Sequence, residues 1–368
     1  MVFKVNVEVK NMWQHTKLTE HLNIRYPIIQ AGMAGSTTPE LVASVCNEGG
    51  LGTIGAGYMS LETLEQEVNI VQHLTDKPYA VNLFVPEPFN YDNTAIEAMQ
   101  TLLEPYYQQY NITTAEVKDH PKQHFIDAIQ LLIRKKVPVV SFTFGLPSTD
   151  IINLLKSNGI KTIATAGSVR EAQAIEQAGI DIVVAQGHEA GGHKGTYTNA
   201  RGIGSMALIP QIADSLTIPV VAAGGIMDAR GVLAALTLGA SGVQMGTAFL
   251  TSHESKAPVV HKDAILKAKP DDTTITKVFS GKAARGIEND FIRHIEATGT
   301  PLPYPLQNDL TTPIRKQAAQ QGDTNNLHMW CGQAPMLAKR NHANELLSAI
   351  VTQVDHLILG FVSKNTTL

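Results

Sequence analysis

Residues 218–225 read IPVVAAGG, and residues 242–250 read GVQMGTAFL. Both are short apolar runs that contain or end in glycine, and residues 228–238 between them carry apolar side chains at helical spacing. Uniformly apolar runs of this length are typical of strands that are buried on both faces of a parallel sheet. The two segments therefore predict consecutive strands that are joined by a helix.

The same unit recurs along the preceding part of the chain. Six further apolar runs are followed by helix-length amphipathic stretches, and they span residues 28–33, 51–57, 79–85, 137–145, 161–167 and 181–187. The helices are predicted at residues 39–48, 61–74, 168–178 and 206–215. Eight strand–helix units predict an α/β fold in which a (β/α)8 TIM barrel closes on itself. An open doubly wound sheet is the structural alternative.

Two segments interrupt this repeat. We assign residues 1–250 to the barrel, with an elaborated insertion at about 87–136, because the connection after the third run is much longer than a normal crossover. Residues 251–368 are predicted to form a smaller helical C-terminal region over the barrel mouth, ending in a helix at residues 344–362 and contributing to the substrate pocket.

Composition excludes several function classes. The 368 residues carry a net charge of −4 with scattered basic residues, so no nucleic-acid partner is expected. Cys46 and Cys331 are too far apart in sequence and too few for a disulfide framework or a cysteine-rich zinc site. No signal peptide or apolar run of membrane-spanning length is recognised. We predict a cytoplasmic protein that acts on a small molecule without a metal, and a homo-oligomer remains open.

The strand ends carry the residues that indicate chemistry, because TIM barrels build their active sites there. Asn82, Gln186 and Gln244 offer amide donors and acceptors that suit the edge of a flavin ring, although each amide can instead bridge neighbouring backbone. Gly224-Gly225 and Gly246-Thr247 follow the last two strands, where the barrel phosphate site forms. The alternative for these glycines is an ordinary strand-to-helix turn.

The loop at residues 186–195 reads QGHEAGGHKG and is the strongest local signal. A histidine on such a glycine-rich loop can donate or accept a proton, so His193 is the catalytic candidate. A solvated histidine without a function is the alternative. His188-Glu189 and His193 do not reproduce the helical spacing of a zinc protease motif, and we predict no metal site.

These motifs together resemble the nitronate monooxygenase family, formerly called 2-nitropropane dioxygenases. The resemblance rests on QAGMAG at residues 30–35, Asn82, the 186–195 loop, AGG at residues 223–225 and QMGT at residues 244–247, and it spans nearly the whole chain. It implies a barrel that binds FMN and oxidises alkyl nitronates, such as propionate 3-nitronate, with O2 to a carbonyl compound and nitrite.

The resemblance also assigns residues. His193, the catalytic candidate, matches the histidine of the family's AGGH loop. The residues that the resemblance places at the flavin are Gly32, Met33, Asn82, Gln186, Gly191, Gly225, Gln244, Met245, Gly246 and Thr247. The phosphate-site argument adds Gly224. One large class of the family has SFHFG at the end of the fourth strand, where this chain reads SFTFG. Thr143 cannot act as a base at neutral pH, so deprotonation of neutral nitroalkanes is in doubt or falls to His193. We expect Thr143 in the substrate pocket and Tyr304 to close it from the C-terminal region.

Two other functions remain open at this stage. The first is a flavin-dependent enoyl-acyl carrier protein reductase or an NAD(P)H:quinone reductase, because the chain also resembles these enzymes in its barrel and loop. A barrel that only binds a phosphorylated ligand would use the glycines, but it would leave His193 and the strand-end amides without a purpose.

Overall fold

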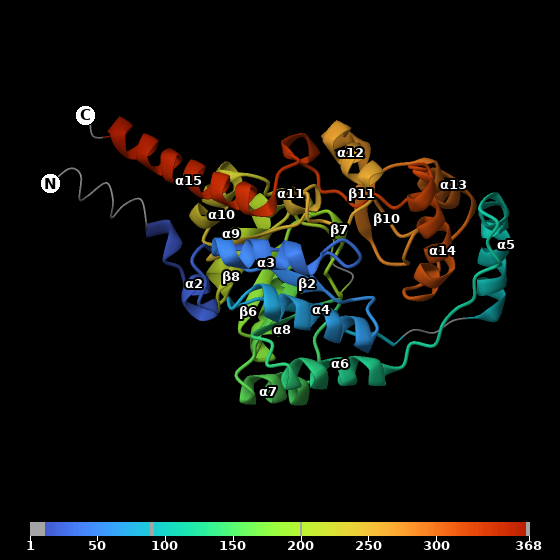
Figure 1. Cartoon of the computed structure of the whole chain (residues 1–368), viewed down its shortest axis with the longest axis horizontal. Coiled ribbons are helices and arrows are strands. Elements are labelled where there is room, and N and C mark those ends of the chain that lie inside the picture. Colours follow the sequence, from blue (N-terminus) through green and yellow to red (C-terminus); the bar gives the residue numbers. More distant parts are fainter. Residues whose placement is uncertain (1–11, 89–91, 199–200, 366–368) are drawn as a thin grey trace.

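The computed structural model describes residues 12–88, 92–198 and 201–365 of the chain. Its centre is a sheet of eight parallel strands surrounded by helices (Figure 1). The strands are β1 Ile28–Gln30, β2 Thr53–Gly55, β3 Ala80–Phe84, β4 Val139–Thr143, β5 Lys161–Ala166, β6 Ile182–Gln186, β8 Val220–Ala223 and β9 Gly242–Met245. Each lies within one of the eight apolar runs, so the predicted strands are confirmed.

The sheet closes into a barrel. Its order is β1-β9-β8-β6-β5-β4-β3-β2, and a parallel bridge between Ile29 and Leu51 joins the two outer strands. The Leu51 N–H donates to the Ile28 carbonyl over 3.0 Å, and the Gln30 N–H donates to the Leu51 carbonyl over 2.9 Å. The predicted (β/α)8 barrel is therefore confirmed, and the open-sheet alternative is wrong.

The side chains of each strand divide between two cores because successive residues point to opposite faces. Ala80, Val139 and Val184 pack inside the barrel, where Leu18 and Leu22 of α2 (Lys17–Leu22) also lie and cover one end. Their neighbours, such as Val81 and Val140, pack outward against the helices. Burial on both faces explains why the strands are apolar throughout rather than alternating.

Capped helices connect the strands. Thr38, Ser60 and Ser168 each accept a hydrogen bond from a first-turn backbone N–H, which begins α3, α4 and α8 as typical N-caps. The connecting helices are α3 Pro39–Glu48, α4 Leu61–Leu74, α6 Lys122–Arg134, α7 Thr149–Ser157, α8 Val169–Gln177, α9 Ser205–Ser215 and α10 Ala229–Thr237.

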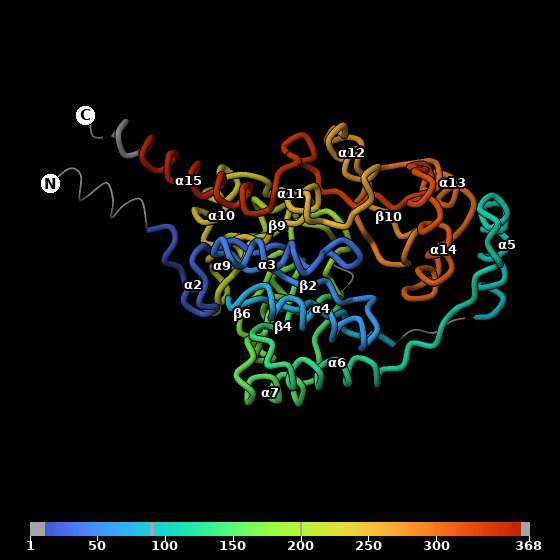
Figure 2. Tube along the Cα trace, viewed as in Figure 1, coloured from blue at the N-terminus to red at the C-terminus, as the bar shows by residue number. Residues whose placement is uncertain are grey.

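The long connection after β3 contains two helices. Its first, α5 (Asn93–Gln109), lies beside α14 (Leu306–Gln321) at the far end of the molecule, as the chain trace in Figure 2 shows. Leu103 and Tyr107 of α5 share a buried cluster with Leu310 and Ile314 of α14. The insertion and the C-terminal region therefore form one packed unit beside the barrel.

The region after residue 250 is not helical throughout. The strands β10 (Thr273–Thr276) and β11 (Ala284–Ile287) pair antiparallel, and β11 also pairs with β7 (Gly192–His193) from the predicted catalytic loop. The Thr-rich run at 273–276 has high strand propensity but is too short to stand out in the sequence. The remaining elements are α11 Thr247–Leu250, α12 Val259–Lys267, α13 Asp290–Thr298, α15 Ala343–Asn365 and the 3-10 helices η1 Met12–Gln14, η2 Pro270–Asp272 and η3 Pro335–Leu337.

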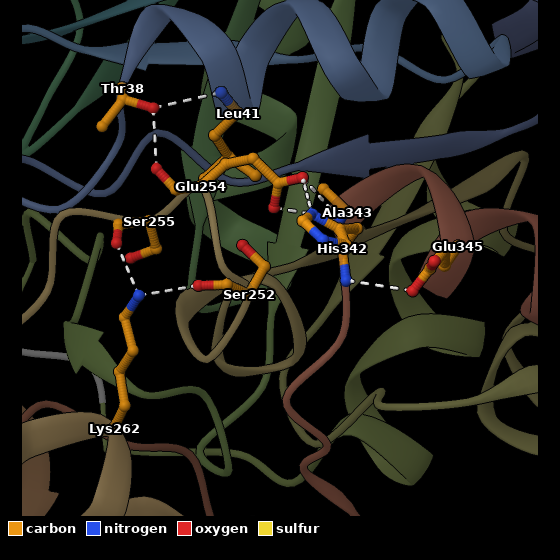
Figure 3. Close-up of polar contacts among 9 residues, drawn as sticks. All are labelled: Thr38, Leu41, Ser252, Glu254, Ser255, Lys262, His342, Ala343 and Glu345. Carbon is orange, nitrogen blue, oxygen red and sulfur yellow. Dashed lines mark hydrogen bonds and ion pairs between the residues drawn. The ribbon is translucent and has the colours of Figure 1, made fainter. Parts of the chain in front are cut away.

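Helix α15 packs on α3 and α10 at the side of the barrel. Glu254 fixes its start, because its carboxylate accepts hydrogen bonds from the Ala343 N–H at 3.1 Å and from His342 Nδ1 at 3.0 Å (Figure 3). The Glu254 carbonyl accepts a hydrogen bond from the Thr38 hydroxyl at 2.8 Å, and Lys262 Nζ donates to the carbonyls of Ser252 and Ser255. This network joins the loops that follow β1 and β9, which border the predicted cofactor site.

No helix within the described ranges is both long enough and apolar enough to cross a bilayer.

Candidate active site

The predicted strand-end residues point into the barrel mouth. Ala80, Val139 and Val184 pack in the barrel interior, so residues two or four positions further along each strand share that face. For β9, Val243 and Met245 pack outward against the helices, which leaves Gln244 pointing inward. The strand parity therefore brings together Asn82, Phe84, Thr143, Gln186 and Gln244 at the carboxyl ends of the strands.

Asn82 is held in place by β4. Its amide Nδ2 donates to the Ser141 hydroxyl at 2.9 Å and to the Thr143 hydroxyl at 3.0 Å. Gly32 lies against the same side chain, because a Cβ at Gly32 would come within 2.8 Å of the Asn82 Cβ. The Thr143 hydroxyl is thus engaged with an amide, and Gly32 is required by the close approach of the β1 and β3 ends.

Gln186 fixes the loop that carries His193. Its Oε1 accepts a hydrogen bond from the Gly195 N–H at 2.7 Å, and its Nε2 donates to the His193 carbonyl at 3.2 Å. This is the backbone-bridging arrangement that the sequence left open for each amide. By contrast, the half-buried amide of Gln244 has no partner within the described residues.

His193 is neutral and hydrogen-bonded. Its Nε2 lies 2.8 Å from the Ser280 hydroxyl, which precedes β11. Burial, followed by the positive charges of Arg315 and Lys282, lowers the pKa of His193 to about 3. At neutral pH the imidazole can donate or accept a hydrogen bond, but it is a weak base.

An aromatic cluster surrounds His193, and we define it as Phe84, Phe144, Tyr304 and Trp330. The Phe144, Tyr304 and Trp330 rings come from three separate segments. Phe144 lies 5.4 Å from the His193 ring and 5.5 Å from the Tyr304 ring between ring centres. Trp330 lies 5.5 Å from His193, and Phe84 lies 4.5 Å from Phe144. The structure thus packs Tyr304 against Phe144, which itself contacts His193, and adds three aromatic residues that were not predicted.

Phe144 carries backbone strain. Its φ is +75°, a left-handed conformation that non-glycine residues adopt rarely, and its side chain is fully buried. Such strain persists only when the surrounding structure enforces it, and it concentrates at functional sites. The Phe-X-Phe spacing in SFTFG is the sequence signal that indicates this position, since it puts Phe144 directly after the end of β4.

The glycines after β8 and β9 leave backbone donors open. Gly224 and Gly225 have φ of +109° and +72°, so both need glycine. In the part of the chain that the structure describes, the N–H groups of Gly225, Gly246 and Thr247 have no hydrogen-bonding partner. A set of free backbone N–H groups at these two strand ends fits a phosphate.

The C-terminal chain packs closely on the His193 loop. A Cβ at Gly191 would lie 2.4 Å from the Gly332 nitrogen, and the Gly332 N–H donates to the Thr247 hydroxyl at 2.9 Å. The other two predicted cofactor residues differ in placement. Met245 is buried in the outer core, so only its backbone faces the barrel mouth, whereas Met33 is half-buried and its N–H donates to the Thr37 hydroxyl.

Within the described ranges, no group of three or more His, Cys, Asp or Glu side chains is arranged to hold a metal ion. The chemistry available at this site comes from amides, free backbone donors, a neutral histidine and aromatic rings.

Comparisons with known proteins identify the family of the chain. A family model described as nitronate monooxygenase matches residues 15–353. A probable nitronate monooxygenase from Staphylococcus haemolyticus is 53% identical over 353 residues, which cover 94% of this chain and 99% of the relative.

Two solved structures are also similar. Nitroalkane oxidase from Streptomyces ansochromogenes superposes with a TM-score of 0.88 at 36% identity, covering 94% of this chain and 100% of that chain. FabK from Thermotoga maritima superposes with a TM-score of 0.76 at 32% identity, covering 95% and 99%. The family match across the chain and the identity to the curated relative confirm the resemblance seen in the sequence: this chain belongs to the nitronate monooxygenase family and is an oxidoreductase.

Proposed function

We propose that this chain is an FMN-dependent enzyme that oxidises alkyl nitronates, propionate 3-nitronate among them, with O2 to a carbonyl compound and nitrite. One observation carries the proposal. A neutral His193, hydrogen-bonded to Ser280 and surrounded by aromatic rings, lies at the same end of the barrel as the open backbone donors of Gly225, Gly246 and Thr247. The name of the curated relative, a probable nitronate monooxygenase, supports a nitronate as the substrate.

The residues at the strand ends fit FMN. The free N–H groups of Gly225, Gly246 and Thr247 would hold the phosphate, and the unpartnered amide of Gln244 would meet the polar edge of the ring. Asn82 would meet the same edge through its carbonyl oxygen, because both protons of its amide are already donated. When bound, FMN supplies the electron-accepting and O2-reactive chemistry that amino-acid side chains lack.

His193 orients the substrate in this proposal. A nitronate is already deprotonated, so its oxidation needs no base, and a histidine with a pKa of about 3 is suited to hydrogen bonding rather than to proton abstraction. Ser280 fixes the ring orientation through Nε2. The imidazole therefore holds a nitronate oxygen, and Thr143 takes no part in proton transfer because its hydroxyl is a very weak base.

The aromatic cluster provides the apolar part of the pocket. Its rings lie within 4.5–6.4 Å of one another or of His193 between ring centres. They contact the alkyl chain of the substrate and exclude water from the reacting carbon. Tyr304 comes from the C-terminal region and completes the enclosure.

The test begins with the visible spectrum of the purified protein. We expect flavin absorbance, its loss on anaerobic addition of propionate 3-nitronate, and stoichiometric nitrite once O2 is admitted. His193→Ala with full FMN content is expected to oxidise the nitronate much more slowly. A flavin spectrum that nitronate leaves unchanged would overturn the proposal. Bleaching by NADH or NADPH instead would support the reductase alternative that the sequence left open.

A further inference from the structure

A buried arginine without an ionic partner lies next to this site. Arg315 on α14 is 8% exposed, and its Nη2 donates to the Asn308 carbonyl, the Asn308 Oδ1 and the Thr312 hydroxyl over 2.7–3.0 Å. All three acceptors are neutral. Arg315 Nε is buried and has no partner, and Arg315 forms no ion pair with any described residue.

The nearby carboxylates are engaged elsewhere. The Asp309 carboxylate is close enough for its charge to act on Arg315, but it accepts hydrogen bonds from His120 Nε2 at 2.7 Å and from the Lys118 N–H at 3.0 Å. Glu87 forms an ion pair with Lys282 at 2.7 Å. Of the two cations that act on His193, Lys282 is therefore paired and Arg315 is not.

Arg315 lies on a part of α14 that packs next to the active site. Thr311, one helical turn earlier on α14, donates to the carbonyl of Phe279, and the next residue, Ser280, bonds to His193. Burial is the main cause of the shifted pKa values of three neighbouring groups, raising that of Tyr58 and lowering those of His193 and His328, and the positive charge of Arg315 is a second, downward contribution to each. Tyr58 packs edge-on against Phe84 at 5.3 Å, and His328 packs edge-on against Trp330 at 5.5 Å. The charge of the guanidinium therefore reaches residues that pack on Phe84 and residues that pack on Trp330.

A buried charge without a counter-charge is unfavourable, and burial lowers the pKa of Arg315 to about 10. An incoming anion would remove this penalty, and a guanidinium is suited to bind a carboxylate through two N–H groups. The region then offers three kinds of group: His193, the aromatic rings and the cation of Arg315. This set of groups suits a molecule with a nitronate at one end, a short alkyl chain, and a carboxylate at the other end.

We propose that Arg315 is a specificity-determining residue that binds a carboxylate at the substrate end opposite the nitronate, so that the preferred substrates carry two negative charges. This inference rests on the proposed function of the same site. It distinguishes carboxylated nitronates from simple alkyl nitronates of similar length, which would leave Arg315 buried and unpaired.

The test compares two substrates in three enzymes. The substrates are propionate 3-nitronate and propyl-1-nitronate, and the enzymes are wild type, Arg315→Met and Arg315→Lys, all with measured FMN content. For Arg315→Met we expect kcat/KM to fall on the order of 100-fold with the carboxylated nitronate, mainly through KM, and less than about 3-fold with propyl-1-nitronate. Arg315→Lys keeps the charge and should recover part of the loss.

A binding measurement provides a readout that does not depend on turnover. Succinate, which has two carboxylates and cannot be oxidised here, is expected to raise the melting temperature of wild type but not of Arg315→Met. Equal losses with both nitronates, or an equal succinate shift in wild type and Arg315→Met, would overturn the inference and leave the proposed function standing. A wild-type enzyme that oxidises neither nitronate would overturn the proposed function, and the succinate shift would then decide on Arg315 alone.

Discussion

Glu171→Ala is expected to lower the free energy of unfolding by about 3 kcal/mol. Glu171 lies in the first turn of α8, is 1% exposed, and holds the segment that follows the His193 loop. Its carboxylate accepts hydrogen bonds from the Gly167 N–H at 2.7 Å, from the Tyr197 N–H at 3.1 Å, and from Thr196 and Thr198. One buried carboxylate thus joins the end of β5 to residues 196–198.

The magnitude follows from which of these bonds water can replace. Thr198 is exposed, so its donors regain hydrogen bonds with solvent, and the Thr196 hydroxyl can rotate to the Thr198 carbonyl, to which it already donates at 3.1 Å. The N–H groups of Gly167 and Tyr197 lose charged acceptors, and hydrogen bonds to charged groups contribute about 1.5 kcal/mol each at the lower end of their range. Two such bonds account for the expected 3 kcal/mol.

Urea denaturation followed by circular dichroism measures this change, and Glu176→Ala is the matched control. Glu176 lies on the same helix and accepts hydrogen bonds from Thr217 and Ile218, but these bonds are near solvent, and we expect a loss below about 1 kcal/mol. Amide exchange at Tyr197 should accelerate only in Glu171→Ala. Equal destabilisation by the two variants would refute the reasoning.

Three further predictions concern the site itself. Burial lowers the pKa of His193 from 6.5 to about 3, so the neutral imidazole stabilises the fold fully above pH 6.5, and this stabilisation is lost as the pH falls toward 3. His193→Asn should therefore reduce the pH dependence of the unfolding free energy between pH 6.5 and 3. An unchanged slope would contradict this. Gly225→Ala should lower FMN affinity more than about 10-fold, as measured by flavin release. The control is Gly159→Ala, which has the similar φ of +74° but lies in open space, and it should lower stability without changing flavin release. Wild type should oxidise ethylnitronate but not nitroethane at pH 7, because neither Thr143 nor His193 is an effective base; catalysed nitrite release from fresh nitroethane would show that a base exists.

Local patterns were enough to predict the barrel and one face of its site. Each apolar run sets a strand, and the alternation of side chains then decides that Asn82, Gln186 and Gln244 point to the same interior. Residues at the carboxyl ends of parallel strands meet at one mouth whatever the details of packing. The glycines after β8 and β9 are predictable for the same reason, since their conformations depend on local turns.

Which strand-end polar groups are hydrogen-bonded within the protein, and which are available to a ligand, depended on tertiary contacts. Gln186 looks like Gln244 in the sequence, yet Gln186 is engaged by the His193 loop and Gln244 is unpartnered within the described residues. Met245 follows Gln244 directly, but its side chain lies in the outer core. A motif shows which residues reach the mouth, and only the folded chain shows which of their polar groups remain available.

The amino-acid sequence by itself determined the number of barrel strands, the mouth at which the site forms and the place of the His193 loop after the sixth of them, because these follow from local periodicity. The tertiary structure alone decided the rest of the site. Phe144, Ser280, Arg315 and Trp330 are far apart along the chain. The end of β4 in the barrel brings Phe144 to His193, the pairing of β7 with β11 brings Ser280 and Trp330 there, and the packing of α14 brings Arg315 close. Such contacts depend on the burial of surfaces that no local pattern encodes, and they lower the pKa of the histidine and leave the arginine without a counter-charge.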